Sequence, residues 1–144
     1  MAPRRAREPT VTLGAAAPRG RRLVITLVDV ERDRADGVGL HVTTRGVRPR
    51  LQGSLWIAGT WVMQLAARLA AQTADDPPIS LTDPWSDYDL RFSSGAAVLT
   101  ATLERRATPS RAGASVAIAF DSSQRPALLE FIAELAARRG PSTF

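Results

Sequence analysis

The chain has 144 residues, 44% of them hydrophobic, which is enough for one domain with a core of its own. It contains no cysteine and a single histidine, so disulfide frameworks, thiolate chemistry and zinc sites built from several imidazole or thiolate ligands are excluded. No apolar run approaches the ~20 residues of a membrane-spanning helix. A cysteine-free chain of this kind suits a reducing compartment, and we predict a cytoplasmic location.

The positive charge is concentrated at the N-terminus. All 19 basic residues are arginine, and the formal net charge is +5. Residues 1–22 hold one acid and six arginines: Arg4, Arg5, Arg7, Arg19, Arg21 and Arg22. Residues 23–144 hold thirteen arginines and thirteen acids, so they are neutral by count. A neutral body argues against a folded nucleic-acid-binding domain, which normally carries basic charge on one face.

We interpret residues 1–22 as a flexible basic arm, in which Thr10–Leu13 could pair as a short strand. Glu8 and Pro9 interrupt any signal-peptide pattern. Residues 23–140 are predicted to form a single domain, and residues 141–144 a tail.

The first half of the domain reads as strands. Leu23–Glu31 is apolar on both faces, as in a central strand. The Asp36-Gly37 pair signals a hairpin turn. Val38–Thr44 and Val47–Leu55 then alternate between apolar and polar residues, with Pro49 placing the second of these strands at an edge or near its own start.

A helix follows, with Thr60 as its N-cap and Gln72 near its end. Apolar residues recur in it at three- and four-residue spacing, which predicts one buried face. These residues are Trp61, Val62, Leu65, Ala66, Leu69 and Ala70.

The second half repeats the order of strands and then a helix. After an irregular piece at Ile79–Trp85, Tyr88–Phe92 and Leu99–Leu103 alternate as strands. Ser115–Phe120 alternates in the same way and leads into a helix that ends near Gly140. Asp121, Ser122 and Ser123 offer capping oxygens at its start, and its apolar face is predicted to hold Leu128, Phe131, Ile132 and Leu135.

The pattern predicts an α+β domain of two layers. Short turns join consecutive strands, so the strands should pair antiparallel in one sheet of about six strands. Both helices are expected to pack on one face of that sheet, in the order β-β-β-α-β-β-β-α.

The densest acidic stretch is Asp75–Asp89, yet it does not match a calcium loop. An EF-hand needs Gly at its sixth position and Glu at its twelfth, where this chain has Tyr88 and Ser94. We therefore predict no metal site, no catalytic residue and no cofactor, and read the stretch as a polar loop whose Trp85 tucks into the core. His41 falls on the polar side of its strand, with no nucleophile or acid evident beside it.

Trp56 and Trp85 flank predicted elements and have two readings: caps on the ends of the core, or exposed anchors for a partner. Exposed Trp beside Arg is typical of protein-binding hot spots. Under the second reading the partner surface is the polar sheet face and its rim, with candidate residues Arg45, Arg48, Trp85, Asp87 and Arg91.

Three stretches carry a resemblance: LWIAGTWVMQLAARLAAQ, WSDYDLRFSSGAAVLTATLE and SVAIAFDSSQRPALLEFIAEL. Together they resemble small actinobacterial proteins of unknown function related to WapI-type immunity proteins, over roughly residues 23–139. The resemblance implies an α+β fold and a toxin-neutralising role by occlusion. It carries no catalytic residue over to this chain, which departs from the group at Asp121–Gln124, where the group more often has the acid and Gln adjacent.

We therefore expect a non-enzymatic protein-binding domain, for which the resemblance implies the role of an immunity-type factor. The alternative is an accessory protein that binds nucleic acid or an anionic surface through its arginine-rich arm. An enzyme whose site is not visible in the sequence is a third reading.

Overall fold

The computed structural model describes residues 9–15, 20–29, 37–95 and 98–138. Eight strands form two antiparallel four-stranded sheets, each with its strands in sequence order. Sheet A consists of β1 (Thr10–Gly14), β2 (Arg22–Asp29), β3 (Gly37–Arg45) and β4 (Gln52–Ala58). Sheet B consists of β5 (Ile79–Thr82), β6 (Tyr88–Ser94), β7 (Leu99–Arg105) and β8 (Ala114–Phe120).

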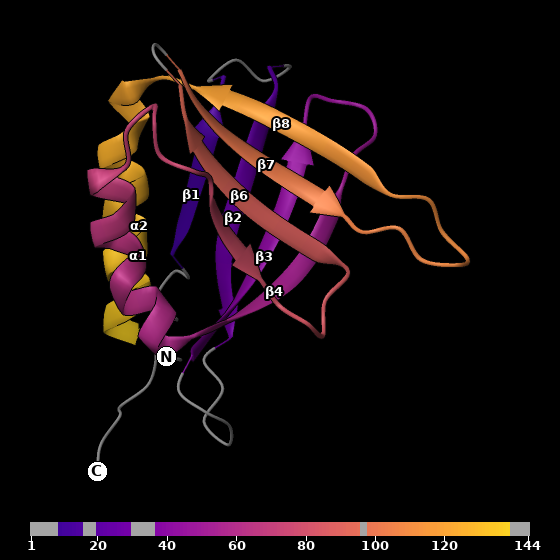
Figure 1. Cartoon of the computed structure of the whole chain (residues 1–144), viewed down its shortest axis with the longest axis horizontal. Helices are drawn as coiled ribbons and strands as arrows, with labels where there is room; N and C mark the ends of the chain where they lie inside the picture. Colours follow the sequence, from indigo (N-terminus) through magenta and orange to yellow (C-terminus); the bar gives the residue numbers. More distant parts are fainter. Residues whose placement is uncertain (1–8, 16–19, 30–36, 96–97, 139–144) are drawn as a thin grey trace, which may run out of the picture.

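Each sheet is followed by a helix. Helix α1 (Gly59–Ala71) begins directly after β4, and α2 (Arg125–Arg138) follows β8 after a short 3-10 turn, η1 (Ser122–Gln124). Figure 1 shows β6–β8 crossing in front of sheet A, with the two helices side by side on one flank. None of the helices within the described residues is long and apolar enough to cross a membrane.

The prediction of an antiparallel α+β domain is confirmed, but the prediction of one sheet of about six strands is wrong. Two strands account for the difference in number. Thr10–Gly14 lies within the expected arm, and Ile79–Thr82 was expected to be irregular. Alternation shows which residues share a face of one strand. It carries no information about which strands pair in one sheet.

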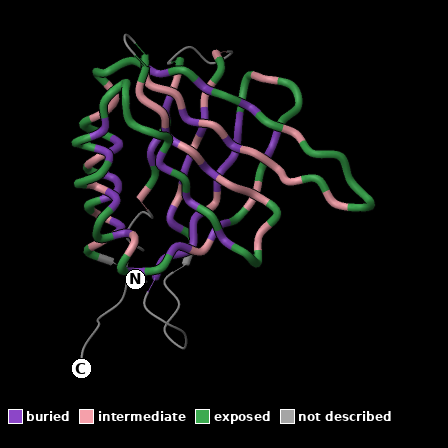
Figure 2. Tube along the Cα trace, in the orientation of Figure 1, coloured by how far each residue is buried: buried purple, intermediate pink, exposed green. Residues whose placement is uncertain are grey.

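One core lies between the sheets and the helices, and Figure 2 shows the buried residues along the middle of the molecule. The alternating positions of β2, Leu23, Ile25 and Leu27, face this core. On the helices, the predicted buried positions Leu65, Leu69, Leu128, Phe131, Ile132 and Leu135 are confirmed. Trp61 is only partly buried, with the Arg68 guanidinium 4.8 Å from its ring centre.

The start of the domain differs from the expected boundary at residue 22. Val11 and Leu13 of β1 are buried in the core, and Arg22 is the first residue of β2. Thus Thr10–Gly14 and Arg22 belong to the folded body rather than to a separate arm. Residues 1–8, 16–19 and 139–144, which include the predicted tail and the expected end of α2 at Gly140, lie outside the described residues.

The strand expected at Val47–Leu55 begins only at Gln52. A turn occupies the residues between β3 and β4, with Gly46 in the left-handed region at φ +72°. The Leu51 backbone N–H donates to the Thr44 hydroxyl at 2.9 Å, and the Thr44 backbone N–H donates to the Leu51 carbonyl at 2.9 Å. These bonds fix the turn as a compact unit.

Candidate functional site

The outer face of sheet A is the side of that sheet that points away from the core. Strand register places Thr26, His41 and Ser54 in one row across β2, β3 and β4. The outward positions by register are Thr10, Thr12, Arg22, Val24, Thr26, Asp29, Gly37, Gly39, His41, Thr43, Arg45, Gln52, Ser54, Trp56 and Ala58. Asp29 is the one acid among them, and the others carry hydrogen-bond donors and acceptors, two arginines, one imidazole and one indole ring.

Basic residues mark one end of this face. Arg22 and Arg45 are paired across β2 and β3. Arg48 and Arg50 follow in the turn closed by Thr44 and are exposed. Within β1–β4 the sole acid is Asp29, at the opposite end of β2, and its side chain lies outside the described residues.

An aromatic ring marks the other end. Trp56 is half-buried, and its indole lies over Gly37: a Cβ built on Gly37 would come within 2.7 Å of Trp56 Cζ2. Because glycine has no Cβ, the indole of Trp56 can lie directly against the backbone at residue 37. The indole is therefore held against the sheet and still partly open to solvent.

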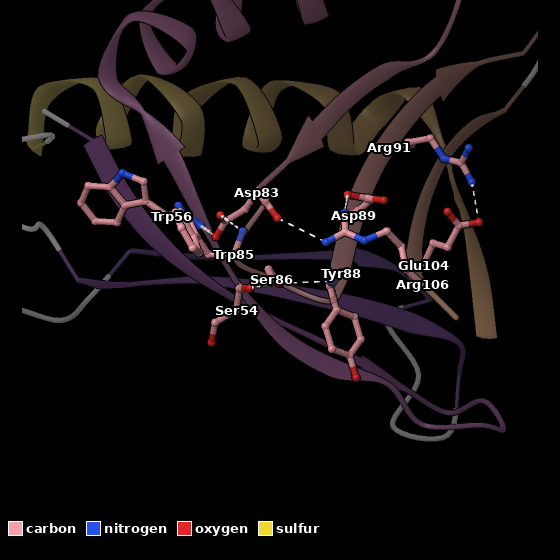
Figure 3. Close-up of polar contacts among 10 residues, drawn as sticks. All are labelled: Ser54, Trp56, Asp83, Trp85, Ser86, Tyr88, Asp89, Arg91, Glu104 and Arg106. Atoms are coloured by element: carbon pink, nitrogen blue, oxygen red, sulfur yellow. Dashed lines mark hydrogen bonds and ion pairs between the residues drawn. The ribbon is translucent and has the colours of Figure 1, made fainter. Parts of the chain in front are cut away.

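Asp83 fixes the edge of sheet A beside Trp56. Its side chain is 7% exposed, and its two oxygens accept the backbone N–H groups of Trp56 and Trp85, each at 2.9 Å. Figure 3 shows this carboxylate between the two tryptophans. One buried acid thus positions the backbone of both residues.

Further contacts hold the β5–β6 loop on β4. The Ser86 hydroxyl donates to the Ser54 carbonyl at 2.6 Å and accepts the Tyr88 N–H at 3.1 Å. Arg106 binds Asp89 at 2.8 Å and the Asp83 carbonyl at 3.3 Å (Figure 3). These bonds cover the backbone edge of β4, which would otherwise be open to strand pairing.

The outer face of sheet B has a different character, because its cations are paired with acids. Arg91 of β6 lies 3.3 Å from Glu104 of β7, and both side chains are about two-fifths exposed at 39% and 38%. Arg106 is paired with Asp89 as described above. This face offers little uncompensated positive charge.

The structure does not bring the predicted partner residues into one surface. Arg45 and Arg48 lie at the basic end of sheet A, whereas Arg91 lies on the outer face of sheet B. Trp85 and Asp87 lie in the β5–β6 loop, both exposed. Trp85 is 90% exposed, so the expectation that it tucks into the core is wrong.

Of the predicted basic arm, only two arginines fall within the described residues. Arg21 donates to the Ala117 carbonyl of β8 at 3.2 Å, and Arg22 donates to the Gly20 carbonyl at 3.2 Å. Arg4, Arg5, Arg7 and Arg19 lie outside the described residues.

In the acidic stretch, carboxylates bind the protein itself. Asp83 holds two backbone amides and Asp76 accepts the Thr73 N–H at 2.8 Å. Among the residues that the structure describes, no three His, Asp or Glu side chains are grouped to hold a metal ion.

Sequence reasoning missed the roles of Asp83, Ser86 and Gly37. Their contacts with Trp56 and Ser54 join residues 19 to 32 positions apart, so local spacing gives no signal for them. The Asp83-Pro84-Trp85-Ser86 run itself was visible, and an Asp or Ser followed by backbone amides is a common turn signal.

No protein-family model and no curated protein sequence matches this chain. Among solved structures, its fold is similar to the crystal structure of WHY3 from Arabidopsis thaliana, with a TM-score of 0.59 at 12% identity. The similarity covers 95% of this chain and 90% of that one. At this identity the likeness concerns the fold alone.

Proposed function

We propose that this protein binds single-stranded nucleic acid on the outer face of sheet A, without catalysis. The observation that carries the proposal is the composition of that face: hydroxyl and amide side chains, a tryptophan at one end, arginines at the other, and Asp29 as the one acid in the register of its strands. Proteins that bind single strands combine positive charge along the backbone path with aromatic rings on which bases stack.

Residues 23–144 are neutral by count, but this does not oppose the proposal, because their acids and arginines are unevenly distributed over the molecule. Six of the thirteen acids lie in the β5–β6 loop, on β6 and β7, and on α2, and two of these, Asp89 and Glu104, are paired with Arg106 and Arg91. Asp29 ends β2 of sheet A, and the acids at positions 31, 33 and 36 lie outside the described residues. Arg22, which the count assigned to the arm, lies in sheet A opposite Arg45. A neutral sum therefore coexists with one face that favours anions.

Trp56 supports a single strand over a duplex. Its ring lies on Gly37 and stays partly open, so an unpaired base has an aromatic surface available. In a duplex the bases are stacked inside, and the face would meet phosphates only. We expect tighter binding to oligo(dT) than to a duplex of equal length.

Substitution of Arg45 tests the proposal. Each phosphate contact on a single strand adds about 0.7 to the slope of log K against log salt. Arg45→Gln should therefore lower that slope by about 0.7 and weaken oligo(dT) binding about fivefold at about 0.1 M salt. Arg111→Gln, at an exposed arginine in the β7–β8 hairpin, is the matched control and should change neither quantity. Equal losses in both variants would refute a role for this face.

A deletion separates this proposal from binding through the arm. Removing residues 1–8 takes away Arg4, Arg5 and Arg7 but leaves β1 intact. If sheet A carries the site, the shortened protein still binds and still responds to Arg45→Gln. Loss of all binding on this deletion would assign the activity to the arm instead.

The second candidate function is binding to a protein, in line with the immunity-type resemblance. Trp85 favours it, because a ring that is 90% exposed on a backbone fixed by Asp83 and Ser86 suits a hot spot. Capture of partners from the native host with the native protein and with Trp85→Ser tests it. A partner that is lost with Trp85→Ser but kept with Arg45→Gln would favour this function over the first.

A further inference from the structure

We propose that Trp85 is a second base-stacking residue of the site on sheet A, so that a bound single strand continues from Trp56 onto the β5–β6 loop. This inference rests on the proposed function and adds a contact to it. Trp85 is 90% exposed, more than any other large hydrophobic residue that the structure describes. Proteins that bind single strands use aromatic rings of this kind, on which successive bases stack.

The β5–β6 loop lies along the edge of β4, beside the outward residues of sheet A. Asp83 accepts the Trp56 N–H at 2.9 Å, and the Ser86 hydroxyl donates to the Ser54 carbonyl at 2.6 Å. Trp85 lies between these two anchors in the sequence. Its backbone therefore runs past the part of β4 that carries the outward side chains of Ser54 and Trp56.

One carboxylate fixes how far apart the two tryptophans are. The oxygens of Asp83 accept the backbone N–H groups of Trp56 and Trp85, each at 2.9 Å (Figure 3). Because both bonds share one carboxylate, the two backbone nitrogens lie within about 8 Å of each other. Two indoles at this separation can contact bases that are close together on one strand.

The Trp85 ring lies outside the core. Leu55 and Ile57, the inward residues of β4 at this edge, are each only 2% exposed, so the inner side of the strand is filled. A ring as exposed as that of Trp85 does not lie among them. It is instead open to solvent at the rim beside Trp56, where a strand that crosses β4 can reach it.

The charges near Trp85 are acidic, so the contact there has to come from bases rather than phosphates. Asp87 is exposed in the same loop, and Asp29 is paired with Gly39, which lies opposite Trp56. A thymine base is uncharged and stacks on an indole through its ring face. Loss of the Trp85 ring should therefore lower affinity without changing its salt dependence, unlike loss of an arginine at the other end of the face.

The experiment measures binding of the full chain to oligo(dT) and to an abasic oligomer of equal length, which keeps the phosphates but lacks the bases. Trp85→Ser should weaken oligo(dT) binding about fivefold or more, the effect of removing one stacked base, with an unchanged slope of log K against log salt. Its binding to the abasic oligomer should equal that of the native protein. Trp85→Phe keeps a ring and should retain most of the affinity for oligo(dT).

The matched control is Met63→Ser, which removes an exposed apolar side chain from α1 and should change binding to neither probe. Equal losses of Trp85→Ser on oligo(dT) and on the abasic oligomer overturn base stacking by this ring. Unchanged oligo(dT) binding in Trp85→Ser overturns the inference and leaves the proposed function intact; a captured protein lost in the same variant then assigns Trp85 to a protein partner. Absence of oligo(dT) binding by the native protein refutes the proposed function and this inference together.

Discussion

Removal of the Asp83 carboxylate should lower the free energy of unfolding more than most single substitutions outside the hydrophobic core. Asp83→Ala leaves the backbone N–H groups of Trp56 and Trp85 without the oxygens that they bind at 2.9 Å. A buried donor left without its acceptor costs about 1–3 kcal/mol. Because both N–H groups are only partly buried and water can reach them in part, we expect a total loss of about 2–4 kcal/mol.

Urea unfolding followed by tryptophan fluorescence measures this loss directly. Asp83→Asn keeps the volume and one acceptor oxygen, so its unfolding free energy should fall between those of the native protein and Asp83→Ala. The matched control is Asp87→Ala in the same loop, where the side chain is exposed and the expected change is within about 0.5 kcal/mol. Equal midpoints for the native protein and Asp83→Ala would refute the role assigned to this carboxylate, as would an Asp87→Ala variant that is equally destabilised.

Three further predictions concern stability. Deleting residues 1–14 should lower the melting temperature markedly because it removes the two buried side chains of β1, whereas an unchanged melt would mean that β1 contributes nothing to the core. Arg125→Gln should cost about 1–2 kcal/mol in urea unfolding, since the guanidinium binds three carbonyls at the C-terminal end of α1; an unmoved midpoint would contradict this. Hydrogen bonds from the hydroxyl and then the amide of Ser123 lower the pKa of Asp121, against a small opposing effect of burial. The resulting stability is complete above about pH 4 and is lost as the pH falls through the lowered pKa, so acid titration should destabilise the native protein more steeply than Asp121→Asn.

Local periodicity predicted the elements well and their assembly poorly. The three- and four-residue spacing around Leu65 and Ile132 gave most of both helix faces, because a helix surface depends on residues that are neighbours in sequence; Ala70, which was expected on the buried face, is exposed. The division into two sheets depends on which strands form hydrogen bonds with each other, and no pattern within a single strand encodes that pairing. β5, with four residues, is too short for alternation to separate it from a loop.

The candidate site was predicted in parts. Arg45 and the outward position of His41 follow from alternation along β3. The composition of the face does not, because it requires knowing that β1 and Arg22 belong to this sheet and that Asp83 is turned inward. Adding charges along the sequence concealed this separation, because it counted Arg22 with the arm and summed Arg45 of sheet A with the acids of sheet B.

The two halves of the fold share one plan, four antiparallel strands in sequence order followed by a helix, yet their outer faces differ. Shared architecture explains the parts that serve the core: in both halves alternate strand residues are apolar and the helix covers one flank. Core packing places no such demand on outward residues, so these are free to differ. On sheet B the outward Arg91 forms an ion pair with Glu104. On sheet A, Arg22 and Arg45 lie opposite each other at one end, and Trp56 lies over Gly37 at the other. Because core packing does not require this difference, the outer face of sheet A is where the proposed binding should be tested first.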